Sequence, residues 1–183
     1  MAEQAAKRRE RTGGGSDRPR LFVVFGDQLD LDAALLESVA PDDTVFMAEV
    51  AEESSAVPSH IQRTTLFLSA MRHFAAGLKE RGIRTRYVEL DDPRNTGRME
   101  SEITRAAREL NSGAIVCTRP GDWRIVAMLE RARSAMGIPV EMMADGHFLT
   151  TPEEFASWAQ GRKTLTMEFF YREQRRRDRK SVV

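Results

Sequence analysis

The segment LFVVFGDQ, at residues 21–28, decides the fold class of this protein. Its first five residues are all apolar, and they are rich in β-branched and aromatic side chains. A strand that is apolar on both faces is typical of a parallel sheet covered by helices on each side. The run ends at Gly26, Asp27 and Gln28, so we expect the chain to leave the sheet there.

Four further apolar runs predict four more strands, and they cover residues 43–50, 84–92, 114–118 and 138–143. Amphipathic helical patterns lie between them, at about residues 59–81, 100–110 and 122–136. Glycines follow the first and the last of these helices as C-terminal stops, at Gly82 and Gly137. Strands that alternate with helices predict a parallel sheet with right-handed crossovers. The expected fold class is therefore α/β, an open, doubly wound (Rossmann-like) parallel sheet of about five strands with C-terminal connector helices.

We divide the chain into three regions, which are a disordered basic and glycine-rich tail at residues 1–19, the α/β domain at 20–145, and connector helices with a basic tail at 146–183. The first connector helix is predicted from Thr151 as N-cap, Pro152 at the first helical position and Glu154 three residues after the cap. A second connector helix is expected from about residue 163 into the arginines.

The composition excludes several classes of protein. The chain has 28 basic and 28 acidic residues, so no overall basic field steers it to DNA. Cys117 is its single cysteine, which excludes a disulfide within the chain and a cysteine metal cluster, and fits a reducing cytoplasm. No apolar run approaches the roughly 20 residues that span a bilayer, and the N-terminus lacks the apolar stretch of a signal peptide. We expect a cytoplasmic protein that does not bind membranes.

Ligands of open α/β sheets bind beyond the carboxyl ends of the strands. The residues expected there are Gly26, Asp27, Gln28, Glu49, Glu52, Glu53, Asp91, Asp92 and the segment 119–122. This edge is acidic and has one glycine after the first strand, without the glycine-rich turns that bind dinucleotides or nucleoside triphosphates. It suits a neutral, hydrogen-bonding ring better than a phosphate.

Structural interpretations of the same residues stay open. Asp27 also suits a turn or a helix cap, and Glu49 and Glu53 also suit solvated carboxylates. The histidines do not predict a metal site, since His60 suits the first turn of the long helix, His73 suits a partly buried position, and His147 stands alone. Ser69 and Cys117 have no histidine near them in sequence, so we predict no hydrolytic triad and assign no catalytic residue.

Six stretches together resemble one family: VVFGDQL (residues 23–29), MAEVAEES (47–54), LSAMRHFAAGL (68–78), YVELDDPRNTG (87–97), TRPGDWR (118–124) and FASWAQGRKTLTMEFFYREQRR (155–176). They resemble the N-terminal domain of the iron–sulfur bacterial cryptochromes and photolyases, the prokaryotic (6-4) photolyases or deoxyribodipyrimidine photolyase-related proteins. The resemblance covers about residues 20–177.

The resemblance implies an antenna domain, which binds the light-harvesting chromophore 6,7-dimethyl-8-ribityllumazine. In full-length members a large helical domain follows, with FAD, a four-cysteine iron–sulfur cluster and the DNA-lesion site. Neither FAD nor the cluster is expected in this chain, so we do not expect it to repair DNA alone. Carried over, the antenna site would comprise Gly26, Asp27, Gln28, Ala48, Glu49, Glu53 as acceptor for the ring imide, and Phe67 as an apolar wall.

This sequence departs from the family pattern at several positions. Gln62 stands where a lysine is usual, Ala56 replaces a frequent aromatic residue, and Asp122 replaces a glutamate. These changes concern the identity and affinity of the chromophore rather than the fold.

The C-terminal helix suggests a second function. Its apolar residues, Leu165, Phe169, Phe170 and Tyr171, either fold back on the domain or form an interaction surface for a partner or a second copy. The arginines after them suit a solvated helix face, so DNA contact is expected to be weak or indirect. Three alternatives to the antenna domain stay open: a ligand-free interaction module, a truncated photolyase fragment and, last, a generic nucleotide-binding enzyme.

Overall fold

The computed structural model describes residues 18–56 and 60–177. Most of the tail predicted at residues 1–19, and the end of the predicted basic C-terminal tail, lie outside the described residues. The chain divides into two compact units, one up to Asp145 (unit 1) and one from Gly146 onward (unit 2).

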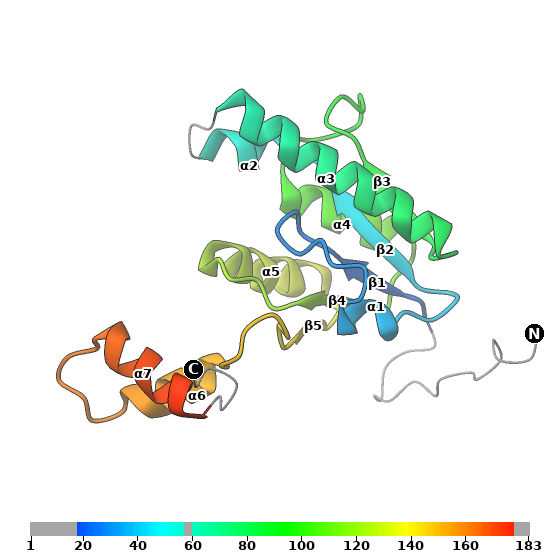
Figure 1. Cartoon of the computed structure of the whole chain (residues 1–183). Coiled ribbons are helices and arrows are strands. Elements are labelled where there is room, and N and C mark those ends of the chain that lie inside the picture. Colours follow the sequence, from blue (N-terminus) through cyan, green and yellow to red (C-terminus); the bar gives the residue numbers. More distant parts are fainter. Residues whose placement is uncertain (1–17, 57–59, 178–183) are drawn as a thin grey trace, which may run out of the picture. The chain divides into compact units, whose positions relative to one another are not determined.

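Unit 1 is built around one parallel sheet with the strand order β3-β2-β1-β4-β5 (Figure 1). Its strands are β1 (Arg20–Val23), β2 (Thr44–Ala48), β3 (Thr85–Val88), β4 (Ala114–Thr118) and β5 (Val140–Met143). All neighbouring strands pair in parallel, and in the centre Leu21 of β1 lies opposite Thr44 of β2 and Ile115 of β4. The predicted α/β fold class and all five strands are confirmed.

The strand order reverses at β1. From β1 the chain adds β2 and β3 on one side, and then returns to add β4 and β5 on the other. The carboxyl ends of β1 and β4 therefore form the topological switch point, where open α/β sheets bind their ligands.

Helices cover both faces of this sheet. They are α1 (Ala34–Glu37), α2 (Ala51–Ala56), α3 (Ile61–Glu80), α4 (Met99–Glu109) and α5 (Trp123–Met136). The sequence analysis did not predict α1 and α2, because each is too short to show a helical period. Glu52 and Glu53, which the sequence analysis placed after the second strand, lie in the helix α2.

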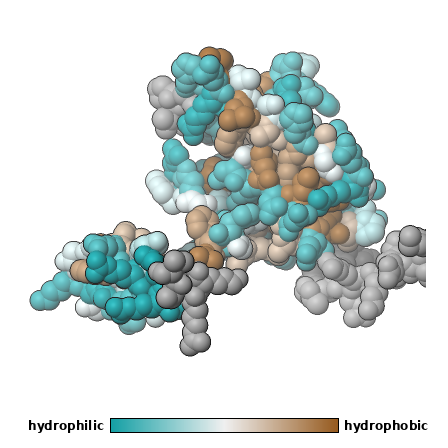
Figure 2. Space-filling model, in the orientation of Figure 1, coloured by the Kyte–Doolittle hydropathy of each residue, from teal (hydrophilic) through white to brown (hydrophobic). Residues whose placement is uncertain are grey.

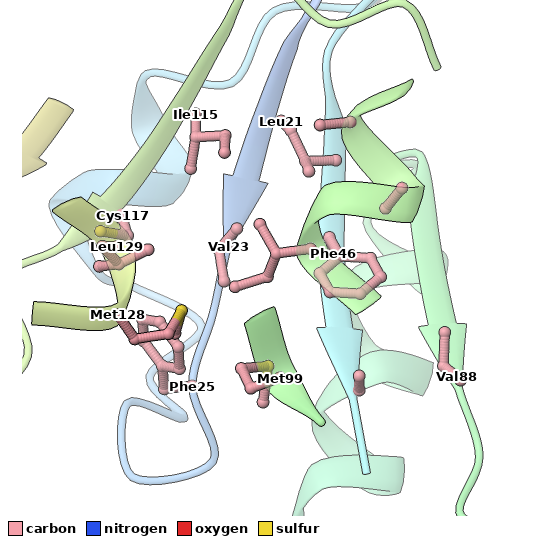
Figure 3. Packing of buried hydrophobic residues seen from close by; sticks show 14 of the residues in the cluster. Leu21, Val23, Phe25, Phe46, Val88, Met99, Ile115, Cys117, Met128 and Leu129 are labelled. Atoms are coloured by element: carbon pink, nitrogen blue, oxygen red, sulfur yellow. The ribbon is translucent and has the colours of Figure 1, made fainter. Parts of the chain in front are cut away.

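The two faces of β1 enter two different cores. Leu21 and Val23 belong to a cluster that also contains buried residues of α4 and α5 (Figure 3). Phe22 and Val24 belong to a second cluster, which includes the buried face of α3 and both leucines of α1. A strand that is buried on both sides explains why the run at residues 21–25 is apolar at every position.

Glycines end two of the helices in unit 1. Gly82 follows Arg81, the last residue of the α3 cap, and Gly137 caps α5, with φ angles of 74° and 67°. This left-handed region is open to glycine at little cost, and the two predicted stops are confirmed.

Unit 2 consists of α6 (Pro152–Ala159) and α7 (Met167–Arg177). The predicted capping box is present, since the Thr151 side chain accepts from the Glu154 backbone N–H and the Glu154 side chain accepts from the Thr151 backbone N–H. Phe155 and Trp158 of α6 pack against Phe170 of α7, with ring centroids 5.1 and 5.0 Å from that of Phe170. Helix α7 begins four residues after the predicted start, Lys163, because residues 160–166 form the connection to α6.

Among the described residues, no helix combines the length and the apolar character that crossing a membrane requires.

Two leucines provide a matched test of the core. Leu129 of α5 is fully buried, whereas Leu66 of α3 is 70% exposed. We expect Leu129→Ala to lower the free energy of unfolding by about 3 kcal/mol, because it removes apolar contacts and leaves a cavity. Leu66→Ala should change it by less than about 0.5 kcal/mol. Urea unfolding followed by circular dichroism measures both, and similar losses in the two variants would contradict this assignment of the core.

Candidate functional site

A cavity of about 620 Å³ lies at the carboxyl edge of the sheet in unit 1. Its lining comes from the ends of β1, β2 and β4 and from α2, α3, α4 and α5. Figure 2 shows a hollow in the surface of unit 1, and Figure 1 shows α2 and α5 on either side of this region. The lining residues are Phe25, Asp27, Val50, Glu52, Glu53, Arg63, Thr64, Phe67, Leu68, Arg98, Met99, Glu100, Pro120, Asp122, Arg124, Ile125, Met128 and Arg131.

Three of the residues predicted from the family resemblance line this cavity. Asp27 follows β1, Glu53 lies in α2 and Phe67 lies in α3. Asp27 and Phe67 are 40 residues apart in sequence, with Glu53 between them. The path of the chain from β1 through β2 to α3 brings all three residues to one edge of the sheet. The topology and the family resemblance therefore lead to the same place.

Gly26 does not line the cavity itself, but it leaves room for the side chain of Phe67, which does. A Cβ atom at Gly26 would lie 2.5 Å from Cε1 of Phe67 and 3.0 Å from Sδ of Met71. The ring of Phe67 therefore rests directly against the backbone at the end of β1, and only a residue without a side chain leaves room for it there.

Gln28 and Ala48 do not line the cavity. The Gln28 amide donates from Nε2 to the backbone oxygen of Thr118 over 3.3 Å, which ties the segment after β1 to the end of β4. Its Oε1 atom is buried and has no hydrogen-bond partner among the described residues. Ala48 is buried in the core cluster with Val50. Both residues therefore belong to the structure of the sheet edge rather than to the lining of the cavity.

Glu49 is also outside the cavity lining, in a buried network of its own. Its carboxylate accepts from Nε and Nη2 of Arg72 at 2.6 and 2.9 Å. It also accepts from the Tyr87 hydroxyl at 2.6 Å and from the Leu90 backbone N–H at 2.9 Å. These four bonds join β2, α3 and the end of β3. The interpretation of Glu49 as a solvated carboxylate is wrong, because its side chain is fully buried.

The network keeps Glu49 ionised. Burial alone would raise the pKa of Glu49, but the hydrogen bonds from Arg72, Tyr87 and Leu90 lower it below 4.5 overall. In the same network, burial and the bond to Glu49 raise the pKa of the Tyr87 hydroxyl. A charge-assisted network of this kind fixes the geometry of the strand ends beside the cavity.

Glu53 has a different environment. Its partial desolvation raises the pKa of this carboxyl, and the negative charges of Asp27 and Glu52 raise it further. No ion-pair partner of Asp27 or Glu53 is found among the described residues. These two carboxyl groups remain able to accept hydrogen bonds from a ligand.

The sequence analysis missed the wall of the cavity that α4 and α5 contribute. Ile125, Met128 and Arg131 follow one another at three-residue spacing along α5. The helical period was visible in the sequence, and so was the start of this helix after β4. What the sequence did not show was that this face turns toward α2.

His60 has a structural role. His60 caps α3, and its Nδ1 atom accepts from the Gln62 backbone N–H at 3.2 Å. Within the described part of the chain, no group of three or more His, Cys, Asp or Glu side chains could hold a metal ion.

Unit 2 separates the aromatic residues predicted to form an interaction surface. Phe170 is buried between α6 and α7, whereas Phe169 and Tyr171 are 53% and 60% exposed and Leu165 is half exposed. Phe170 is therefore not available to an interaction surface that includes Phe169 and Tyr171, because neighbouring residues on a helix point in directions about 100° apart.

Fold and site together define a class, which is a doubly wound α/β domain with a ligand-sized cavity at its topological switch point. The family model of the deoxyribodipyrimidine photo-lyase-related proteins matches residues 22–179. The chain belongs to this family, which confirms the resemblance inferred from the six sequence stretches.

A curated relative and a solved structure are also similar to the chain. The (6-4) photolyase of Agrobacterium fabrum is 42% identical over 159 residues, which are 86% of this chain and 31% of the relative. The chain thus spans about a third of the length of that relative. A universal stress protein family structure from Burkholderia pseudomallei has a TM-score of 0.40 and 22% identity, and the match covers 70% of this chain and 98% of that one.

The Glu49 network gives a pH-dependent test. We expect Glu49→Gln to lower the free energy of unfolding by about 2 kcal/mol at pH 7, since the hydrogen bonds to a buried charge are lost. Because the folded-state pKa of Glu49 is lowered, its stabilisation is complete above the unfolded value of 4.5 and is lost as the pH falls through the folded-state pKa. The difference between variant and parent should therefore shrink in acid.

Urea unfolding at pH 7 and at pH 3 measures this difference. Glu89→Gln is the matched control, because Glu89 is exposed and lies 4.0 Å from the same arginine. A difference that is unchanged in acid, or a control that is equally destabilised, would contradict the assignment.

Proposed function

We propose that unit 1 is an antenna domain that binds a light-harvesting chromophore of the lumazine type, such as 6,7-dimethyl-8-ribityllumazine, in the cavity at the switch point. The observation that carries this proposal is that Asp27, Glu53 and Phe67, nominated by the family resemblance, line one cavity of about 620 Å³. When bound, such a chromophore would absorb near-ultraviolet to blue light and pass the excitation to a flavin.

The dimensions and the lining of the cavity support this proposal. Small-molecule sites typically measure about 300–1,000 Å³ and combine apolar walls with a few polar groups. Phe25, Phe67 and Met128 provide apolar surface for a flat ring. Asp27 and Glu53 provide acceptors for the ring imide N–H and the ribityl hydroxyls, because neither is engaged in an ion pair among the described residues.

We infer that these 183 residues do not repair DNA by themselves. The relative that is named a (6-4) photolyase is about three times as long as the region that it shares with this chain. Repair of a lesion by light depends on an excited reduced flavin, and the cofactor supplies that chemistry. The single cysteine, Cys117, cannot provide the four ligands of the family's cluster. It is buried, and burial raises the pKa of its thiol to about 12, so it stays protonated.

As a second function, we propose that unit 2 offers an interaction surface to another polypeptide, or to a second copy of this chain. The exposure of Phe169 and Tyr171 on α7 favours it. We expect any direct contact of unit 2 with DNA to be weak, because two of its arginines are paired with carboxylates. Arg172 lies 2.7 Å from Glu168, and Arg177 lies 2.9 Å from Glu154. The reduced cysteine is consistent with a cytoplasmic location, which we also propose.

The antenna proposal is tested by adding lumazine to the purified protein and measuring its fluorescence. Gly26→Ala should weaken binding by about tenfold, because the new Cβ forces the Phe67 ring out of its place and into the cavity. Gly146→Ala is the control, since a Cβ there meets nothing within 4 Å and this residue does not line the cavity.

Circular dichroism shows whether both variants remain folded. Phe67→Ser, which removes the apolar wall without crowding β1, gives a second measurement if the Gly26 variant unfolds. A parent protein that is colourless when purified and does not bind added lumazine would overturn the antenna function.

The interaction surface is tested by photo-crosslinking in cells. A benzoylphenylalanine placed at Phe169 should give crosslinked protein, whereas the same group at the exposed Leu66 of unit 1 should give little, since the two positions lie in different units. Phe170 is unsuitable for the probe because it is buried in the aromatic cluster. Equal yields at both positions, or none at Phe169, would contradict this second function.

A further inference from the structure

We propose that the cavity of unit 1 accepts ring ligands with an uncharged polyol side chain and rejects the same ligands when that chain ends in a phosphate. This inference rests on the antenna function and adds a chemical criterion for its ligand. It depends on four features of the cavity: the balance of its charges, the engagement of its arginines, the pair formed by Asp27 and Glu53, and the backbone next to Gly26.

The charges around the cavity do not favour an anion. Five carboxyl groups and four guanidinium groups line it, which gives a formal net charge of minus one. The carboxyl groups belong to Asp27, Glu52, Glu53, Glu100 and Asp122. A phosphate monoester carries nearly two negative charges at neutral pH, so its entry would add repulsion in a partly desolvated space.

Three of the four arginines of the lining are engaged by carboxylates of the same lining. Arg124 lies 2.6 Å from Asp122, and Arg131 lies 3.2 Å from Glu100. The Arg98 guanidinium lies 3.9 Å from Glu52, and Arg63 also interacts with a neighbouring group. A phosphate would have to take a guanidinium away from its carboxylate, and the carboxylate would then be left without its partner.

Asp27 and Glu53 also line the cavity, and the structure shows no ion-pair partner for either of them within residues 18–56 and 60–177. Asp27 acts electrostatically on Glu53, so the groups are close enough to sense each other's charge. A pair of this kind accepts hydrogen bonds from N–H and O–H groups, such as a ring imide and a ribityl hydroxyl. It repels a phosphate.

The backbone after β1 cannot cradle a phosphate either. Phosphate sites at this position of α/β folds use a glycine-rich turn that lets the ligand approach backbone N–H groups closely. Here the space next to Gly26 is filled by the Phe67 ring, which a Cβ atom would meet at 2.5 Å. The glycine makes room for a protein side chain, so it leaves none for a phosphate.

The test compares 6,7-dimethyl-8-ribityllumazine with its own 5′-phosphate ester, since the two differ only in the group at issue. Fluorescence titration of the purified chain should give a dissociation constant at least about tenfold lower for the unphosphorylated compound, which is ~1.4 kcal/mol. Equal affinities, or tighter binding of the ester, overturn this inference and leave the antenna function standing. Binding of neither compound overturns both.

A matched pair of variants tests the cause. Glu100→Gln removes the carboxylate that engages Arg131, so the preference for the unphosphorylated compound should narrow by at least about threefold. Glu130→Gln is the control, because Glu130 pairs with Arg133 on the same helix but does not line the cavity. A ratio of affinities that moves equally in both variants, or in neither, contradicts the role of the engaged arginines.

Discussion

The central strand β1 is the constraint on which the rest of the molecule depends. It pairs with β2 on one side and β4 on the other, and its side chains enter the two cores alternately. Because helices cover both faces, the strand has to be apolar throughout. Because the strand order reverses at β1, its carboxyl end opens into the crevice that the neighbouring elements shape into a cavity. One short segment thus determines the layers, the core and the place of the site.

Two glutamates near the same edge of the sheet, Glu49 and Glu53, have opposite electrostatic environments. Glu49 accepts four hydrogen bonds and has a lowered pKa, so it holds β2, α3 and the end of β3 together. Glu53, four residues later, lines the cavity and has a raised pKa because of burial and neighbouring negative charges. The carboxylate of Glu49 has its hydrogen-bond partners inside the protein, whereas Glu53 has no ion-pair partner among the described residues. The distinction depends on the environment, since the residue type is the same.

The sequence predicted the sheet, the long helices and the edge that carries the site, because hydrophobic period and glycine stops are local signals. Asp27, Glu53 and Phe67 could be nominated since they follow strands or resemble a family motif. The surroundings of Glu49 and Phe170 could not be predicted from the sequence. They depend on Arg72, Tyr87 and Trp158, which lie elsewhere in the sequence and which folding brings close. The short helix α2 was missed for a related reason: six residues are too few to show a period.

Each unit of the protein contains one of its two tryptophans. Trp123, at the start of α5, is 76% exposed, whereas Trp158 packs against Phe155 and Phe170. An indole in water emits at longer wavelength than one packed among aromatic rings, so the two units have distinguishable intrinsic emission. Unfolding of unit 2 would expose Trp158 and move its emission to longer wavelength, whereas the emission of the already exposed Trp123 would change little, so the melting of unit 2 can be followed without attaching a dye.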